Sequence, residues 1–292
     1  MCSRYILASK PQAFEKRFCI TIKGTYLPSY NIGEGKRAWV VSNANPSVLT
    51  QYVFGLTPDD SPYQTLITNV RSEGTKNPDD DPCYTGGMGI IYNPTFNRFL
   101  RSQRCLVIAD GFYTGSAIEG FEKPYLVFLK HKVRPFAFAG IWNRWKNPGT
   151  GENVFGFAIL TTVATGFLRE IGCRRCPVIL EKRDEQAWLN PGSKLNEITR
   201  LLKPYDPSAM DAYEVSSALK DSRNDSVKLL QKTGRQISDK EKKLRVEIQE
   251  LEMKMRNEKV NTRRPETQED YLLIKKHQEL LNKLFDLESP KY

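Results

Sequence analysis

The chain has 292 residues, which is long enough for one sizeable core with an appendage or for two small domains. Its formal net charge of +10 favours a polyanionic partner, most often a nucleic acid. No apolar stretch approaches the roughly 18 residues that a membrane-spanning helix needs, and no secretion signal is apparent. The six cysteines fit a reducing compartment, so we expect a cytoplasmic protein, associated with the nucleoid if its source is bacterial.

Cys2 directly follows the initiator Met1, and a methionine before so small a residue is normally removed. Removal leaves an α-amine and a thiol on one residue. Such a 1,2-aminothiol condenses with an aldehyde to an imine and then closes to a five-membered thiazolidine ring. An α-amine titrates at about 7.7–8.0 and a thiol at about 8.5, so both reactive forms coexist near neutral pH. The alternative is that Cys2 is a small buried hydrophobe near the terminus.

The first two-thirds of the chain contains many short predicted strands and few predicted helices. Runs of β-branched and aromatic residues, bounded by Gly, Pro and Asn, indicate the strands. The predicted strands are residues 38–41, 105–108, 125–129, 136–141 and 155–162, and the predicted helices are residues 11–18 and 184–189. We expect residues 115–123 to form a hairpin loop and residues 73–87 an exposed polar loop. Such crowded short strands favour a closed or barrel-like mixed sheet.

The last part of the chain, residues 236–292, predicts an antiparallel helical hairpin. Ser238-x-x-Glu241 is a capping-box pattern. A heptad seam on the first helix comprises Ile237, Leu244, Ile248, Leu251 and Met255, and two stripes on the second comprise Tyr271, Ile274, Leu281 and Phe285 and also Leu273, Leu280, Leu284 and Leu287. The hairpin either folds back and stabilises the domain or mediates self-association or the binding of a protein partner.

The composition changes between these two parts, which we expect to be separate domains at residues 1–235 and 236–292. From Gln236 onward the chain has 13 Lys and Arg against 12 Asp and Glu. This leaves 31 against 22, or about +9, in the first 235 residues. We therefore expect the phosphate-binding surface in the first domain.

Eight short motifs follow one another in the first 235 residues. They are Met-Cys-x-Arg-Tyr at 1–5, Asn-Val-Arg-Ser-Glu at 69–73, Arg-Cys-Leu-Val-Ile-Ala-Asp-Gly-Phe-Tyr at 104–113, Pro-Phe-Ala-Phe-Ala-Gly-Ile-Trp at 135–142, Phe-Ala-Ile-Leu-Thr-Thr-Val-Ala at 157–164, Arg-Cys-Pro-Val-Ile-Leu at 175–180, Trp-Leu-Asn-Pro at 188–191 and Ser-Arg-Asn-Asp at 222–225. In this order they closely resemble the SRAP family, the SOS-response-associated peptidases or abasic-site processing proteins. The resemblance implies an α+β fold with a β-rich core, to which this chain adds the helical hairpin.

The resemblance also implies a site that captures DNA which has lost a base. The sugar at such a position equilibrates with a ring-opened aldehyde, which Cys2 would trap as a thiazolidine. The expected catalytic positions are Cys2, Asn69, Thr114 and Cys173, and the expected DNA-binding residues are Arg4, Arg71, Thr161, Thr162 and Arg175. Arginines clamp phosphates bidentately, and an asparagine amide both donates and accepts hydrogen bonds. The alternative for Asn69 and Arg71 is a capped turn and a surface salt bridge.

Two positions depart from the family pattern. Thr114 stands where the family places a glutamate, and Cys173 stands where it places a histidine. Those groups are expected to move protons during ring opening, imine formation and reversal of the crosslink. Threonine does not titrate near pH 7, whereas Cys173 could act if Arg174 and Arg175 lowered its pKa. We expect neither a metal nor a cofactor, because Cys173-x-x-Cys176 is a lone cysteine pair and structural zinc needs four ligands.

The main prediction is a divergent abasic-site sensor that binds single-stranded DNA and forms a long-lived covalent adduct. One alternative is a degenerate member of the fold that binds single-stranded DNA without covalent chemistry, through phosphate contacts and aromatic stacking. A second is a peptidase that processes its own N-terminus, and a third is a scaffold whose helical hairpin recruits a partner. Whether the chain is an enzyme stays open at this point.

Overall fold

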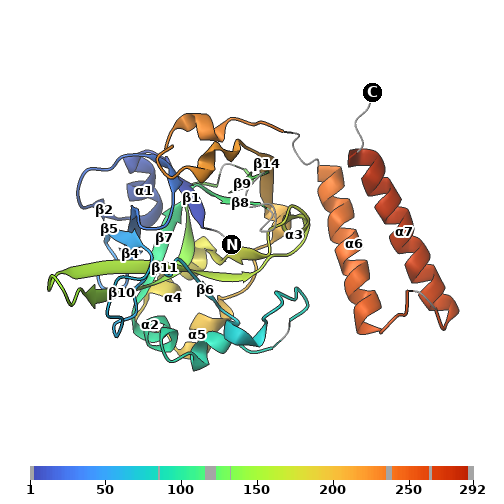
Figure 1. The fold of residues 1–292 in the computed structure, drawn as a ribbon, viewed down its shortest axis with the longest axis horizontal. Coiled ribbons are helices and arrows are strands. Elements are labelled where there is room, and N and C mark those ends of the chain that lie inside the picture. The colour runs from blue at the N-terminus through green and yellow to red at the C-terminus, as the bar shows by residue number, and fades with distance from the viewer. Residues whose placement is uncertain are drawn as a thin grey trace.

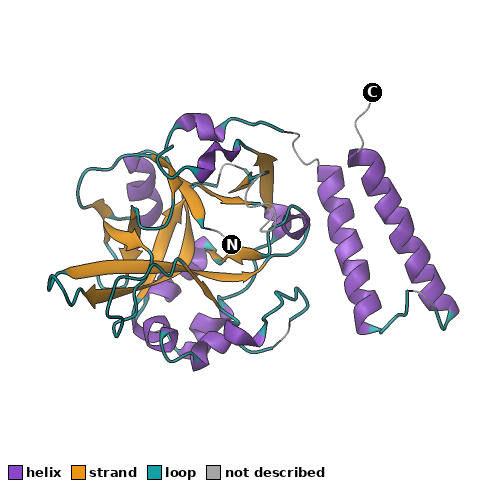
Figure 2. Ribbon diagram, in the orientation of Figure 1, coloured by secondary structure: helices purple, strands orange, loops and turns teal. Residues whose placement is uncertain are grey.

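The structure is a computed structural model that describes residues 3–84, 86–115, 123–131, 133–234, 239–262 and 265–288. It consists of a β-rich body and a pair of long helices beside it (Figures 1 and 2). The strands are β1 (Arg4–Leu7), β2 (Thr21–Ile22), β3 (Ser29–Ile32), β4 (Arg37–Ser42), β5 (Val48–Phe54), β6 (Asn69–Arg71), β7 (Arg104–Ala109), β8 (Gly111–Thr114), β9 (Tyr125–Leu129), β10 (Phe136–Lys146), β11 (Asn153–Val163), β12 (Arg175–Pro177), β13 (Ile179–Leu180) and β14 (Met210–Glu214). The helices are α1 (Pro11–Phe18), α2 (Phe96–Ser102), α3 (Phe167–Glu170), α4 (Lys182–Leu189), α5 (Leu195–Arg200), α6 (Asp239–Asn257) and α7 (Gln268–Glu288).

Five strands of the body close into a barrel. β4 pairs antiparallel with β5 and β7, and β10 pairs antiparallel with β7 and β11. The ring closes where β11 runs parallel to β5, with Gly156 opposite Val53 and Phe157 opposite Phe54. The expected barrel-like mixed sheet in an α+β fold is therefore confirmed.

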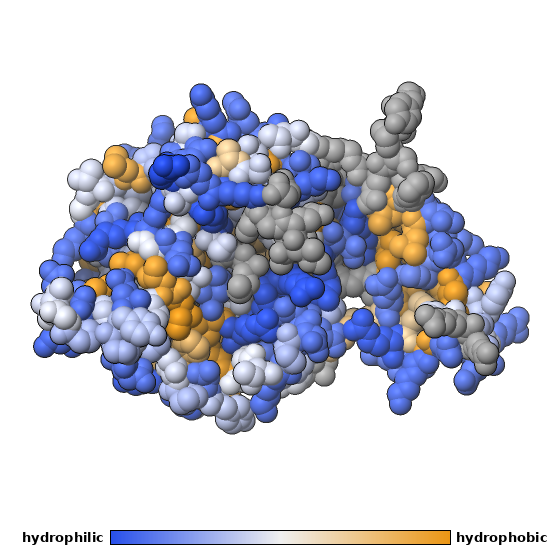
Figure 3. All heavy atoms as spheres, in the orientation of Figure 1, coloured by the Kyte–Doolittle hydropathy of each residue, from blue (hydrophilic) through white to orange (hydrophobic). Residues whose placement is uncertain are grey.

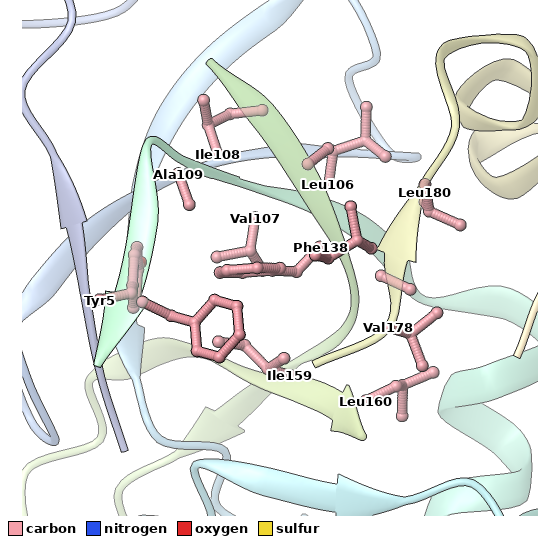
Figure 4. Packing of buried hydrophobic residues seen from close by; sticks show 14 of the residues in the cluster. Tyr5, Leu106, Val107, Ile108, Ala109, Phe138, Ile159, Leu160, Val178 and Leu180 are labelled. Carbon is pink, nitrogen blue, oxygen red and sulfur yellow. The ribbon is translucent and has the colours of Figure 1, made fainter. Parts of the chain in front are cut away.

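A second sheet, ordered β14-β9-β8-β1-β3, packs against the barrel through Tyr5 of β1. The ring of Tyr5 lies 5.4 Å from that of Phe54 and 6.0 Å from that of Phe138, both edge to face. Figure 4 shows Val107 and Phe138 together at the centre of this packing, with Tyr5 on one side and Leu160, Val178 and Leu180 on the other. We call the strand face that packs toward Tyr5 the inner face. Because side chains alternate along a strand, neighbouring residues belong to the opposite, outer face.

Arg104 joins the outer face of the barrel to α4. Its side chain is fully buried, and its Nε donates to the carbonyl of Trp188 at 2.6 Å. Its Nη2 donates to the carbonyl of Asn190 at 2.7 Å, and Trp188 Nε1 donates to the carbonyl of Cys105 at 3.0 Å. These bonds compensate for burying the guanidinium, whose pKa burial lowers. Two of the motifs found in the sequence are thus in direct contact.

The predicted elements agree well with the observed ones. Residues 11–18 and 125–129 form α1 and β9 as predicted, and α4 begins two residues earlier than predicted. β10 and β11 extend beyond their predicted ends and form one long antiparallel pair. β8 and β9 pair antiparallel on either side of the predicted hairpin loop, of which residues 116–122 lie outside the described residues.

The C-terminal helices form the predicted hairpin with an apolar seam of their own. Its buried residues are Ile248, Leu251, Met255, Leu273, Leu280 and Leu284, whereas Ile237 and Ser238 lie outside the described residues. Hydrophobic side chains also reach the hairpin surface (Figure 3), and Tyr271 and Leu272 are 60% and 58% exposed. Self-association through this surface stays a prediction. No described helix combines the length and the hydrophobicity that crossing a bilayer requires.

Asp225, the last residue of the Ser-Arg-Asn-Asp motif, ties the end of the body to β3. Its Oδ1 accepts from the backbone amides of Tyr30 and Asn31, and its Oδ2 accepts from Ser29 Oγ and Lys36 Nζ. Partial burial alone would raise the pKa of this carboxyl, but these hydrogen bonds and the charge of Lys36 lower it below its ordinary value.

We expect Asp225→Asn to lower the stability of the body by about 1–3 kcal/mol, because an amide nitrogen cannot accept the bonds that Oδ2 accepts. A carboxyl whose pKa is lowered in the folded state stabilises it above the ordinary pKa, and that contribution is lost as pH falls through the lowered value. The difference in melting temperature between the two proteins should therefore be largest near pH 7 and shrink below about pH 4. A difference that stays constant across this range would contradict the assignment.

Candidate active site

Several predicted site residues meet on the inner face, where β6 and β11 run side by side. The two strands are parallel, with Asn69 opposite Ile159 and Arg71 opposite Thr161. Paired residues share a face, and Ile159 belongs to the packed core. Asn69, Arg71 and Thr161 therefore lie on one face at the same end of the barrel. The Oδ1 of Asn69 is buried and accepts no hydrogen bond from the described residues.

Thr162 and Arg4 do not join this group. Thr162 follows Thr161 on β11 and pairs with Cys176, so its side chain belongs to the outer face, where it is buried. Arg4 precedes Tyr5 and points the opposite way, with Nη1 donating to Asn31 Oδ1 at 2.9 Å and Nη2 to the carbonyl of Lys220 at 3.0 Å. Burial lowers its pKa. The two threonines therefore face opposite sides of β11, and the described contacts of Arg4 are structural, while the DNA-binding roles predicted for Thr162 and Arg4 stay untested.

Thr114 and Cys173, the two positions that depart from the family pattern, contact each other. Thr114 lies on the inner face of β8, since the preceding inward residue of that strand is Phe112 of the core. Both side chains are about 1% exposed. Burial raises the pKa of the Cys173 thiol, and the adjacent Thr114 hydroxyl counters part of this rise. The Thr114 hydroxyl still makes no regular hydrogen bond among the described residues.

The neighbouring arginines therefore do not lower the pKa of the Cys173 thiol below its ordinary value. The thiol is also within hydrogen-bond distance of the carbonyl of Arg175, with Sγ and O 3.1 Å apart. The charge of Arg175 acts to lower the pKa, but burial has the larger effect and the pKa is raised overall. The condition under which Cys173 could replace a histidine is not met, because a thiol with a raised pKa stays protonated at neutral pH.

The Arg175 side chain is buried and has several partners within the protein, so it is not exposed as a phosphate ligand would be. Its side chain is 1% exposed, and Nη2 pairs with Glu73 Oε2 at 2.6 Å while Nη1 pairs with Asp80 Oδ1 at 3.1 Å. Nη2 also donates to the carbonyl of Thr161 at 2.6 Å. Glu73 Oε1 in turn accepts from the amide of Val163 at 3.2 Å. The DNA-binding role predicted for Arg175 stays untested, and this geometry favours a supporting role.

The segment predicted as an exposed polar loop, residues 73–87, is partly buried. Glu73, Asn77 and Asp80 are 3%, 3% and 4% exposed. Asp80 links the two arginines of the site, because its Oδ2 lies 3.4 Å from Arg71 Nη2 while its Oδ1 bonds Arg175. In the sequence, the run of three aspartates at 79–81 follows the motif at 69–73 closely, but nothing local connects it to Arg175. The structural alternative for Arg71, a salt bridge, is thus present.

Cys2 lies outside the described residues, and Ser3, to which it is bonded, precedes β1. β1 and β8 pair antiparallel with Arg4 opposite Tyr113. Continuing this register places Ser3 opposite Thr114. Among the described residues, no group of three or more His, Cys, Asp and Glu side chains is arranged to hold a metal ion.

Comparison with known proteins identifies the family of the chain. A family model described as SOS response associated peptidase (SRAP) matches residues 1–222. A Bacillus subtilis (strain 168) protein named abasic site processing protein YoaM is 31% identical over 239 residues, covering 79% of this chain and 97% of that protein. A Gallus gallus protein named abasic site processing protein HMCES is 27% identical over 242 residues, covering 71% of this chain and 67% of that protein.

The fold is shared with a crystal structure of a protein from Bacteroides thetaiotaomicron, at a TM-score of 0.66 and 24% identity. The match covers 80% of this chain and 100% of that one. The likeness extends over the body, to which α6 and α7 are added beyond the stretch that the family model matches. From the length of the family match and the identity to YoaM, this chain belongs to the SOS response associated peptidase (SRAP) family.

Proposed function

We propose that this protein acts on DNA damage by binding single-stranded DNA and capturing abasic sites covalently through Cys2, after removal of Met1. The observation that carries the proposal is a Met-Cys start in a chain whose family relatives are named abasic site processing proteins. The charge of about +9 in the first 235 residues, 31 basic against 22 acidic, fits a polyanionic partner. DNA bearing abasic sites is thus the expected partner.

The proposed step needs no metal and no redox partner. The α-amine of Cys2 adds to the aldehyde carbon of the ring-opened deoxyribose, and water leaves to give an imine. The thiol then adds to the imine carbon, so that a carbon–sulfur bond forms and the nitrogen takes up the proton. The balance is one aldehyde and one aminothiol giving one thiazolidine and one water.

The inner-face group supports the proposal by its position and its chemistry. Ser3 precedes Arg4, which pairs with the Tyr113 that precedes Thr114 on β8, and β6 runs from Asn69 to Arg71. The buried Oδ1 of Asn69, which accepts no hydrogen bond from the described residues, suits the Cys2 amine or a sugar hydroxyl as a donor. Arg71, whose side chain is 38% exposed, suits a flanking phosphate.

The reaction should be slow in both directions. Thr114 and Cys173 occupy the positions expected to shuttle protons, and neither titrates near neutral pH in this structure. Aminothiol–aldehyde condensation proceeds without a catalyst, so the adduct still forms. A long-lived adduct fits a sensor or a shield of the lesion better than a rapid turnover enzyme.

The test is a denaturing gel of the purified protein mixed with a single-stranded oligonucleotide that carries one abasic site. We expect a shifted band that Cys2→Ala abolishes and that an oligonucleotide with a tetrahydrofuran in place of the sugar aldehyde does not give. Intact mass should show a chain without Met1. A band of equal strength from Cys2→Ala, or no band from a chain that has lost Met1, would refute covalent capture.

A second candidate is single-stranded DNA binding without covalent chemistry. Neither the Thr114 hydroxyl nor the Cys173 thiol, whose pKa burial raises, titrates near neutral pH, and this favours it. It predicts an affinity that falls steeply with salt, with a slope of about −0.7 per phosphate contact, and that Cys2→Ala leaves unchanged. Salt-dependent binding without a shifted band on the denaturing gel would select this candidate.

A further inference from the structure

An acidic loop, residues 77–83, lies between the candidate site and the C-terminal hairpin. The segment that follows β6, cyan in Figure 1, reaches toward the end of α6. On one side Asp80 pairs with Arg71 and Arg175, and its backbone carbonyl accepts from Arg169 Nη1 at 2.8 Å. On the other side Asp81 Oδ1 accepts from Arg256 Nη1 of α6 at 2.9 Å.

The loop occupies the hydrogen-bonding groups of Arg71 that a phosphate would use. Nη1 of Arg71 donates to the carbonyls of Asn77 and Pro78 at 3.1 and 3.3 Å, and Nη2 faces Asp80. A bidentate contact with a phosphate needs two donors of the guanidinium in one plane. The carboxylate of Asp80 also repels a phosphate. DNA therefore reaches Arg71 fully only when the loop moves away.

A continuous set of contacts connects Arg71 to Arg256. Asn77, whose carbonyl accepts from Arg71, holds the backbone of Asp81 with its side chain, since Oδ1 accepts from Asp81 N at 2.8 Å and Nδ2 donates to Asp81 O at 3.1 Å. Asp81 then pairs with Arg256. Arg256 and Asp81 are 61% and 42% exposed in their side chains, so this last contact is the weak, solvent-accessible member of the set.

The hairpin can move without disturbing the core of the body. Its buried apolar residues form a cluster separate from that of the barrel. At the other end of α6, Lys242 pairs with Asp211 and lies over the ring of Phe167, with its Nζ 5.3 Å from the centroid. Lys242 is mostly buried there, so this end is the firmer attachment. The free energy of opening at Arg256 is therefore that of a surface ion pair, which is small.

We propose that the C-terminal hairpin is an autoinhibitory element in which Arg256 holds the acidic loop against Arg71 and so lowers the affinity for single-stranded DNA. This proposal depends on the proposed function only in that Arg71 contacts phosphate. Arg256 lies on α6, beyond the residues that the family model matches. The proposed inhibition therefore depends on the C-terminal extension of this chain.

Arg256→Ala in the full chain is the decisive variant. The proposal predicts that its affinity for DNA rises, whereas the loss of a positive charge alone predicts that it falls. Loss of a positive charge weakens the binding of DNA in general. Release of the loop instead strengthens it, by about 1.5- to fivefold if the surface pair contributes its usual amount. Lys254→Ala is the matched control, because Lys254 lies on the same helix and pairs with Glu258 and Glu269 of the hairpin.

The measurement is the fluorescence anisotropy of a labelled oligothymidine with no abasic site, in a Cys2→Ala background. We expect Arg256→Ala to bind more tightly than the parent and Lys254→Ala to bind equally or less tightly. Adding Arg71→Ala should remove the gain. Equal weakening by both single variants, a gain that survives Arg71→Ala, or no binding by any variant would overturn the proposal. Covalent capture by the full chain is a separate readout, so either idea can fail alone.

Cys83 provides a second readout of loop opening. Its Sγ lies 3.9 Å from Arg256 Nη1, and the charge of Arg256 works against the effect of burial, which raises the pKa of the thiol. Removing Arg256 would by charge alone make Cys83 less reactive. Faster alkylation of Cys83 in Arg256→Ala, located by peptide mapping, therefore indicates opening, and slower alkylation contradicts it.

Discussion

Replacing Thr114 by glutamate and Cys173 by histidine should speed formation of the DNA crosslink by about 10²–10⁴-fold, the usual contribution of positioned general acids and bases. The two side chains contact each other on the inner face beside the start of β1. A carboxylate and an imidazole there would supply groups that titrate between about pH 4 and 7, where this chain has a hydroxyl and a protonated thiol. The rate of the double variant should also gain a bell-shaped pH profile.

Both positions are about 1% exposed, so the larger side chains cost packing energy, about 1–3 kcal/mol. Thermal melting must therefore show a folded protein before rates are compared. The matched control is Thr114→Gln with Cys173→His, which keeps the volume of the glutamate but not its proton. Acceleration by the glutamine variant equal to that by the glutamate variant would contradict a general-acid role, as would a folded double variant with the rate of the parent. Cys173→His alone provides a smaller change if the double variant is unstable.

The fold was largely predictable because its elements follow local patterns. The strands at 125–129 and 155–162 combine β-branched and aromatic residues with turn residues at their ends, and the hairpin has a regular apolar seam. The closure of the barrel could not be predicted from local sequence patterns. It depends on the parallel pairing of Phe157 with Phe54, residues about 100 positions apart in sequence, and no local pattern encodes such a partner.

The residue types of the site were predictable from the sequence, but the contacts among those residues were not. Alternation alone indicates that Thr161 and Thr162 cannot face the same way, and that Arg4 faces away from Tyr5, so this signal was present in the sequence. The sequence does not indicate that Asp80 is buried. A run of three aspartates between prolines predicts a turn, and which of them is buried depends on Arg169 and Arg175, which lie about 90 residues further along the chain.

The stability of the whole site should depend on Arg175. We expect Arg175→Met to lower the free energy of unfolding by about 3–5 kcal/mol, because it removes the buried guanidinium that pairs with both Glu73 and Asp80 and leaves Asp80 with the longer contact to Arg71. Denaturation in urea, followed by tryptophan fluorescence, measures the change in the transition midpoint. The neighbouring Arg174 is exposed, so Arg174→Met should change the free energy by no more than about 0.5 kcal/mol.

The same network also predicts how the loss can be recovered. Converting Glu73 and Asp80 to their amides in the Arg175→Met chain removes the two buried charges that lost Arg175, and the triple variant should therefore be more stable than Arg175→Met alone. Equal midpoints for the Arg174→Met and Arg175→Met chains would contradict the burial of this ion pair. A triple variant less stable than Arg175→Met would instead show that the carboxylates have other essential partners, such as the amide of Val163 that Glu73 accepts from.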